Sequence, residues 1–231
     1  MRIQTIPDLH GKLIWKELID MTCDKIIFLG DYTDDYPPTT DEQIINNLLD
    51  IIQLKYDYLE KVILLLGNHD EMYYNKHHGC SGYRSSYASI LQTIFESNKN
   101  LFQIAYQEKN YIWTHAGISN DWYNVFLKEV KTLPEGNIAD KLNEIFFNSS
   151  DMDLITCVGR SRGGWAPYGG PIWADKSETY DYYFHALEGY HQIVGHSKVQ
   201  HILKKENKKK DSSITFCDCL DYKNEVLTIE I

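Results

Sequence analysis

Six short apolar segments, each ending at glycine or a polar residue, constrain the fold of this chain more than any other feature. Their short length and their content of Ile, Val, Leu and aromatic residues are typical of strands. Helix-length segments separate most of them, and this alternation predicts an α/β protein in which sheets and helices form layers. The six predicted strands are 3–6, 25–29, 62–66, 111–114, 191–194 and 213–216.

Helices are predicted between these strands. The clearest is 41–59, where Asp41 could cap the first turn and an apolar stripe runs at helical spacing. The stripe consists of Ile44, Ile45, Leu48, Leu49 and Ile52. The other predicted helices are 13–21, 83–98, 120–131 and 138–147. The segment from 192 to 231 is interpreted as strands and turns, with a basic cluster that favours a solvated hairpin loop. The cluster comprises Lys204, Lys205, Lys208, Lys209 and Lys210.

Length, charge and cysteine content limit the possible functions. The 231 residues contain no repeat or linker, which predicts one domain over 1–231. A net charge of −10 makes long nucleic acid an unlikely partner, but a phosphate substrate remains compatible because bound metal ions add positive charge. Five scattered cysteines predict reduced thiols and a cytoplasmic protein. The longest purely apolar run, Val62 to Leu66, is too short to cross a bilayer, so no membrane partner is expected.

Metal-binding residue types follow five of the six predicted strands. Ligands of α/β proteins gather at the carboxyl ends of strands, so we expect these side chains to meet at one edge of the sheet. Carboxylate, amide and imidazole groups without a thiolate suit Mn²⁺, Fe or Zn²⁺. The five motifs are Asp8-Leu9-His10-Gly11, Gly30-Asp31-Tyr32-Thr33-Asp34, Gly67-Asn68-His69-Asp70, His115-Ala116-Gly117 and Gly195-His196-Ser197. The remaining histidines are interpreted as ordinary residues: His77, His78, His185, His191 and His201.

This set of residues has the chemistry of a two-metal hydrolytic site. Asp31 lies in the middle of the set and is the natural bridging carboxylate. Two ions about 3.5–4 Å apart can clamp a phosphate and activate a water molecule. His69 directly follows the candidate ligand Asn68, and it could protonate the leaving oxygen if a carboxylate such as Asp34 held its ring.

In order and spacing, these motifs resemble the calcineurin-like metallophosphoesterase family. The resemblance runs from residue 8 to about 197, and it is strongest to the branch with Ser/Thr protein phosphatases and symmetrical dinucleoside tetraphosphatases. It implies a β-sandwich flanked by helices, with Asp31 bridging two divalent ions and His69 as proton donor oriented by Asp34. Within that scheme, one ion is held by Asp8, His10 and His196, and the other by Asn68 and His115.

One position departs from that branch. Asp35 stands where an Arg usually binds the substrate phosphate, so another cation must do so. Arg162 and Arg160, in a glycine-flanked loop, are the first choices because an Arg fork matches phosphate geometry, and Arg84 is the second. Phosphoproteins, small phosphoesters and dinucleoside polyphosphates remain possible substrates. A nuclease and a non-catalytic interaction module with the same fold are the alternative functions.

Overall fold

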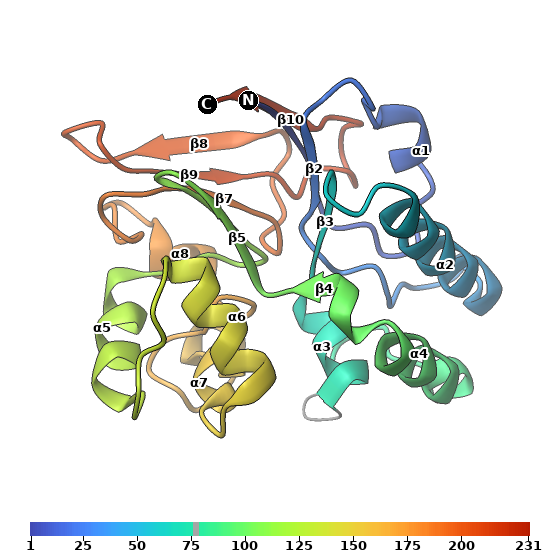
Figure 1. Ribbon diagram of the computed structural model, residues 1–231, viewed down its shortest axis with the longest axis horizontal. Coiled ribbons are helices and arrows are strands. Elements are labelled where there is room, and N and C mark those ends of the chain that lie inside the picture. The colour runs from blue at the N-terminus through green and yellow to red at the C-terminus, as the bar shows by residue number, and fades with distance from the viewer. Residues whose placement is uncertain (76–78) are drawn as a thin grey trace. The chain divides into compact units, whose positions relative to one another are not determined.

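Two five-stranded sheets organise the chain, and each belongs to a separate unit (Figure 1). The computed structural model describes residues 1–75 and 79–231. The first unit consists of residues 1–103 and 219–231, and the second unit consists of residues 104–218. The α/β class with two sheets and accompanying helices is confirmed. This division does not test the prediction that 1–231 form one domain.

The sheet of the first unit has the strand order β10-β1-β2-β3-β4. Strands β1 to β4 run parallel and β10 pairs antiparallel with β1. Strands β2 and β3 are almost wholly buried, as expected for parallel strands covered on both faces. Ile6 pairs with Phe28 and Phe28 with Leu64, so β1, β2 and β3 end side by side. The strands are β1 (Arg2–Ile6), β2 (Lys25–Phe28), β3 (Val62–Leu65), β4 (Phe102–Gln103) and β10 (Leu227–Glu230).

Four α-helices and a 3-10 turn accompany this sheet. The longest, α2, packs against β3 with a buried stripe that includes Ile44 and Ile51, whereas Leu49 is exposed, contrary to the predicted stripe. Its N-cap is Thr40 rather than Asp41, because the Thr40 hydroxyl accepts from the Gln43 amide at 3.1 Å. The helices are α1 (Trp15–Leu18), α2 (Asp41–Asp57), α3 (Asn68–Asn75), α4 (Ser85–Ser97) and η1 (Lys99–Leu101).

The sheet of the second unit has the order β5-β6-β7-β9-β8. Strands β6, β7 and β9 are parallel, and β5 and β8 pair antiparallel at the two edges. Helix α6 packs on β5, where the Asn143 amide bonds to both Ala105 backbone groups. The strands are β5 (Ala105–Glu108), β6 (Tyr111–Thr114), β7 (His191–Val194), β8 (Leu203–Glu206) and β9 (Ser213–Phe216). The helices are α5 (Asn120–Glu129), α6 (Ile138–Asn148), α7 (Met152–Thr156), η2 (Arg160–Arg162) and α8 (Lys176–Thr179).

Three sequence predictions need correction. The predicted helix 13–21 is the single turn α1, because the chain becomes extended at Ile19. The motif Gly67–Asp70 lies outside every predicted helix, but Asn68 begins α3, whose first turn gains from the acidic Asp70 and Glu71. The predicted single sheet edge is also wrong, since the strands that precede the five motifs are divided between two sheets.

The basic cluster was predicted correctly as part of a hairpin. Strands β8 and β9 pair antiparallel, and exposed Lys208, Lys209 and Lys210 lie in their connection, whereas Lys204 and Lys205 lie within β8. Among the described residues, no helix combines the length and apolar character that crossing a bilayer requires.

Candidate metal centre

Backbone hydrogen bonds join the loops that follow β1 and β2 in the first unit. The amides of Leu9 and His10 both donate to the carbonyl of Asp31, at 3.1 and 2.8 Å, and the Gly11 amide donates to the Tyr32 carbonyl at 3.1 Å. These contacts form because the parallel strands end in register. The structure therefore brings the motif at Asp8–Gly11 against the motif at Gly30–Asp34, as the sequence predicted for neighbouring strand ends.

Several candidate residues have left-handed backbone conformations. In the first unit, φ is 46° at His10, 51° at Asp31 and 57° at Asp34, and in the second unit it is 61° at His196. Side chains other than glycine rarely adopt this region, and such strained positions concentrate at functional sites. Surrounding contacts must therefore hold these residues, because the unconstrained backbone would relax.

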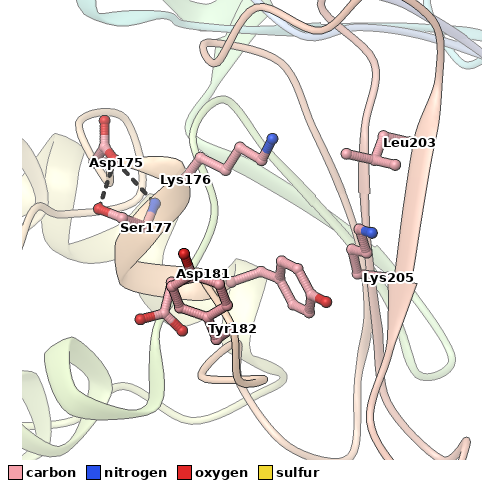
Figure 2. A pocket seen from close by; sticks show the side chains of 8 residues that line it. Asp175, Lys176, Ser177, Asp181, Tyr182, Leu203 and Lys205 are labelled. Atoms are coloured by element: carbon pink, nitrogen blue, oxygen red, sulfur yellow. Dashed lines mark hydrogen bonds between the residues drawn. The ribbon is translucent and has the colours of Figure 1, made fainter.

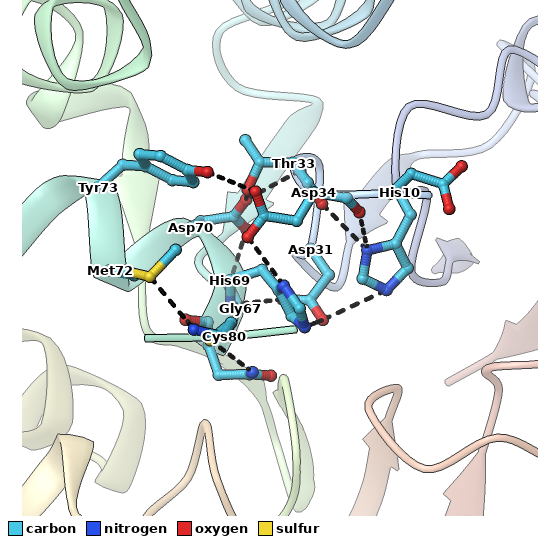
Figure 3. A network of polar contacts seen from close by, with 12 residues as sticks. His10, Asp31, Thr33, Asp34, Gly67, His69, Asp70, Met72, Tyr73 and Cys80 are labelled. Atoms are coloured by element: carbon cyan, nitrogen blue, oxygen red, sulfur yellow. Dashed lines mark hydrogen bonds and ion pairs between the residues drawn. The ribbon is translucent and has the colours of Figure 1, made fainter. Parts of the chain in front are cut away.

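Asp70 supplies much of that support in the first unit (Figure 3). Its fully buried carboxylate accepts from the Tyr32 amide at 3.0 Å, the Thr33 amide at 3.3 Å and hydroxyl at 3.1 Å, and the Gly67 amide at 3.0 Å. It thus ties the loop after β2 to the loop after β3. A β-carbon on Gly67 would lie 2.1 Å from Asp31 Oδ1, so only glycine fits there. Asp70 is part of a motif in the sequence, but no role was predicted for it.

A group of possible metal ligands lies where these loops meet. The side-chain ligand atoms of His10, Asp31 and His69 lie within 4.8 Å of one another. His10 Nε2 is 3.6 Å from Asp31 Oδ2, while His10 Nδ1 donates to the carbonyls of Thr33 and Asp34 at 3.0 and 2.8 Å. With its proton on Nδ1, the ring has its lone pair on Nε2, on the side of Asp31. This is the tautomer that a metal-binding histidine needs. The donor set fits a hard or borderline divalent cation.

Asp8 and Asn68 occupy the same loops of the first unit, outside the group just described. Asp8 is 2% exposed and follows β1 two residues before His10. Asn68 is 3% exposed and opens α3, and its amide nitrogen lies 3.5 Å from Cys80 Sγ. Both are placed at strand ends as predicted, and their role as ligands stays a prediction.

His69 is paired with Asp34 as the sequence suggested. Its Nδ1 lies 3.0 Å from Asp34 Oδ2, and its Nε2 lies 4.0 Å from Asp31 Oδ2 on the other side of the ring. Burial lowers the pKa of His69, but the charge of Asp31 and the hydrogen bond with Asp34 outweigh burial and raise the pKa above its usual value. This arrangement can hold a proton and present it from Nε2.

The second unit brings His115 and His196 together. His115 is fully buried after β6, and His196 follows β7. His115 Nε2 lies 3.2 Å from His196 Nδ1, with ring centroids 5.0 Å apart, and the Trp173 ring packs edge-on against His196. Two imidazole nitrogens this close can share a cation. Each unit therefore assembles its own candidate ligands; His77 and His78 lie outside the described residues.

The three candidate arginines have different surroundings. Arg162 Nη2 donates to Ser197 Oγ at 3.0 Å, and its Nε lies 2.8 Å from Asp175 Oδ2 in an ion pair too bent to count as a hydrogen bond. The guanidinium of Arg162 therefore lies beside the loop that carries His196. Arg160 is exposed. In the first unit, Arg84 pairs with Asp41 at 2.6 Å and donates to two backbone carbonyls.

A shallow groove of about 460 Å³ lies beside the Arg162 loop in the second unit (Figure 2). Its lysines face aromatic rings: Lys176 Nζ is 5.5 Å from the Phe216 ring centre and Lys205 Nζ is 5.0 Å from that of Tyr180. Asp175 and Asp181 also line it, so its charges balance. Such a groove lacks the excess positive charge that a phosphate site requires.

Comparison with known proteins identifies relatives of this arrangement. A family model described as calcineurin-like phosphoesterase matches residues 1–200. The fold is similar to that of a cold-active protein-tyrosine phosphatase from a psychrophilic Shewanella species, with 16% identity, a TM-score of 0.57 and coverage of 99% of this chain and 75% of that chain. It is also similar to a protein serine/threonine phosphatase from Saccharomyces cerevisiae, with 15% identity, a TM-score of 0.52 and coverage of 94% and 67%. No curated protein matches the sequence.

Proposed function

Because this chain belongs to the calcineurin-like phosphoesterase family, we propose that it hydrolyses a phosphorylated substrate with two divalent metal ions and the His69–Asp34 pair. Family membership makes the chain a metal-dependent hydrolase of phosphoesters, and it leaves the alternative of a non-catalytic interaction module without support. The proposal concerns three points: the number of metal ions, the proton donor and the substrate.

Six residues would hold the two ions. One ion would take Asp8, His10 and His196, the other Asn68 and His115, with Asp31 shared between them. The mutual proximity of His10 and Asp31 in the first unit, and of His115 and His196 in the second, supports this assignment. Mn²⁺ is the expected metal, with Fe and Zn²⁺ as alternatives that suit the same donors. When bound, the ions would polarise the phosphoryl group and lower the pKa of the attacking water.

The hydrogen bond between His69 and Asp34 is the observation that carries the proposed mechanism. A carboxylate only accepts, so Asp34 keeps the proton of His69 on Nδ1 and leaves Nε2 as the atom that exchanges a proton. The negative charge of Asp34 also stabilises the protonated ring that a general acid needs. His69 would therefore protonate the leaving oxygen as the phosphoester bond breaks.

Arg162 is the proposed phosphate-binding residue. It uses Nη2 and Nε toward Ser197 and Asp175, and these two contacts orient the guanidinium while other N–H groups remain for a ligand. Arg160 lies in the same loop and is the second choice, whereas Arg84 is bound by the carbonyls of Asp35 and Thr39 in the segment between β2 and α2. The net charge of −10 makes a small phosphomonoester a better match than a nucleic acid.

An activity screen under metal control tests the proposal. The Mn²⁺-loaded protein is assayed with p-nitrophenyl phosphate, its bis-ester, a phosphopeptide and a dinucleoside tetraphosphate, before and after treatment with a chelator. We expect monoester hydrolysis that chelation abolishes and Mn²⁺ restores. Preference for the bis-ester would favour the nuclease, and preference for the tetraphosphate the dinucleoside polyphosphate hydrolase. Activity that survives chelation would contradict the proposal.

A further inference from the structure

Two tyrosine hydroxyls converge on one oxygen of Asp34 in the first unit. Tyr73, from α3, and Tyr87, from α4, both donate to Asp34 Oδ1, the latter at 2.9 Å. The opposite oxygen, Oδ2, accepts from His69 Nδ1 at 3.0 Å. Figure 3 shows the Tyr73 hydroxyl directed at Asp34 across from His69. Among the described residues, the two tyrosines therefore bind one oxygen of Asp34 and the histidine binds the other.

This division restricts how the Asp34 carboxylate can turn. Its side chain is fully buried, and both tyrosines are 1% exposed, so no solvent water competes for Oδ1. With two donors fixed on Oδ1, rotation of the carboxylate would break both hydrogen bonds and leave buried groups unsatisfied. The plane of the carboxylate is thereby set, and Oδ2 stays directed at the His69 ring.

Both phenols keep their protons at ordinary pH and donate them to Asp34, because a carboxylate only accepts. Burial, followed by the hydrogen bond and charge of Asp34, raises the pKa of the Tyr73 phenol, and burial followed by the charge of Asp34 raises that of Tyr87. Phenylalanine would fill the same space, so packing by itself does not need the hydroxyls. Packing does not explain why both hydroxyls donate to the same oxygen of Asp34.

We propose that Tyr73 and Tyr87 are positioning residues for proton transfer, which act through Asp34 to keep the His69 ring in one tautomer and one orientation. This inference rests on the proposed role of His69 as general acid. Both tyrosines are 1% exposed, so neither would touch the substrate. Their contribution should therefore appear in the proton-transfer step and not in substrate affinity.

Phenylalanine substitutions test this role. Tyr73→Phe, Tyr87→Phe and the double variant are compared with Tyr32→Phe, which also removes a buried hydroxyl, but one that donates to the Leu65 carbonyl at 2.8 Å. Loss of partners that orient a catalytic group typically costs about 10–100-fold in activity. We expect the double variant to lose that much kcat for an alkyl phosphate, with little change in KM or metal content. The loss should be smaller for p-nitrophenyl phosphate, whose leaving group needs little protonation.

Two further measurements separate positioning from a purely structural role. In the His69→Asn background, the tyrosine substitutions should cause no further loss of kcat, although they still lower Tm. In the metal-free protein, at a pH above the pKa of His69 where the ring is neutral, ¹⁵N NMR should report the Nδ1-protonated tautomer, and a mixture of tautomers in the double variant. Tyr32→Phe should lower Tm without changing the ratio of alkyl to aryl rates or the tautomer.

The outcomes also distinguish this inference from the proposed function. If His69→Asn is strongly impaired for alkyl phosphates while the double variant keeps the ratio of alkyl to aryl rates and a single tautomer, the inference is wrong and the role of His69 stands. If the double variant loses the same factor in both backgrounds, the hydroxyls serve stability alone and the inference is again wrong. If His69→Asn is fully active, the proposed general acid fails, and this inference fails with it.

Discussion

The two units hold their candidate site residues by different means. In the first unit, backbone amides and the buried carboxylate of Asp70 fix the loops after β1, β2 and β3. In the second unit, one backbone hydrogen bond joins the loops after β6 and β7, from the Gly195 amide to the His115 carbonyl at 2.8 Å. Side-chain contacts add to it: His115 contacts His196, and Arg162 contacts Ser197 and Asp175. The Arg162 side chain is 29% exposed, whereas that of Asp31 is 3% exposed.

This difference predicts that the two units contribute to different steps, the first to the chemistry and the second to substrate binding. The buried, strained residues of the first unit can supply precise chemistry, because their geometry is over-determined. The partly exposed arginine of the second unit can adjust to a ligand at lower structural cost. Substitutions in the first unit should therefore affect turnover most, and substitutions around Arg162 should affect substrate binding.

The largest effect is expected for Asp31→Asn. A neutral amide bridges two cations poorly, so both ions should be lost or weakened and activity should fall to the level of the chelator-treated protein. Metal analysis and steady-state kinetics measure both effects. Asp35→Asn is the matched control, because this neighbouring carboxylate accepts from Tyr36 and Thr39 instead of facing the cluster. Normal metal content and turnover in Asp31→Asn would rule out the bridge.

His69→Asn should have the next largest effect. Loss of a positioned acid typically slows hydrolysis by roughly 10²–10⁴-fold, and the metals should remain bound. Comparing alkyl with p-nitrophenyl phosphates isolates the acid, because the aryl leaving group needs little protonation. An equal loss for both substrates would show that His69 has another role. Proton donation could then no longer be assigned to the first unit.

Arg162→Ala should have a smaller effect, and this effect should be confined to substrate binding. Removing a charge-assisted partner of a phosphate costs about 1.5–3 kcal/mol. We therefore expect kcat/KM to fall by roughly 10–100-fold with a raised KM and unchanged metal content. Arg160→Ala, from the same exposed loop, is the control in parallel kinetics. If Arg160→Ala caused the whole loss, the phosphate-binding charge would lie two residues earlier, at the start of η2.

Arg84→Ala should have the smallest effect on activity and should act on stability instead. Its guanidinium pairs with Asp41 and donates to the carbonyls of Asp35 and Thr39, so its removal leaves these acceptors without their partner. We expect the free energy of unfolding to fall by about 1–2 kcal/mol, measured by denaturant titration, with kcat/KM nearly unchanged. A loss of kcat/KM equal to that of Arg162→Ala would place the phosphate beside Arg84.

Local patterns in the sequence predicted six of the described strands and most long helices, but they missed β4 and β5. The segments 111–114, 191–194 and 213–216 form strands with the predicted bounds, and 41–59 became α2 over Asp41–Asp57. Their apolar periodicity reflects burial, which is encoded residue by residue. The motifs that carry Asp8, His10, Asp31 and Asn68 were visible for the same reason, because each stands directly after such a strand.

Only the tertiary structure decided which strands share a sheet and which distant groups support the site. Pairing separates β4 from β5 at neighbouring positions of the chain, and no periodicity marks that division. Tyr87 and Asp34 are separated by 53 residues, and Asp70 and Tyr32 by 38. A buried carboxylate must find donors wherever the fold places them, so these partners leave no local pattern to read. The sequence by itself thus determined the candidate reacting groups, because each follows a predicted strand, while the fold decided which side chains hold them.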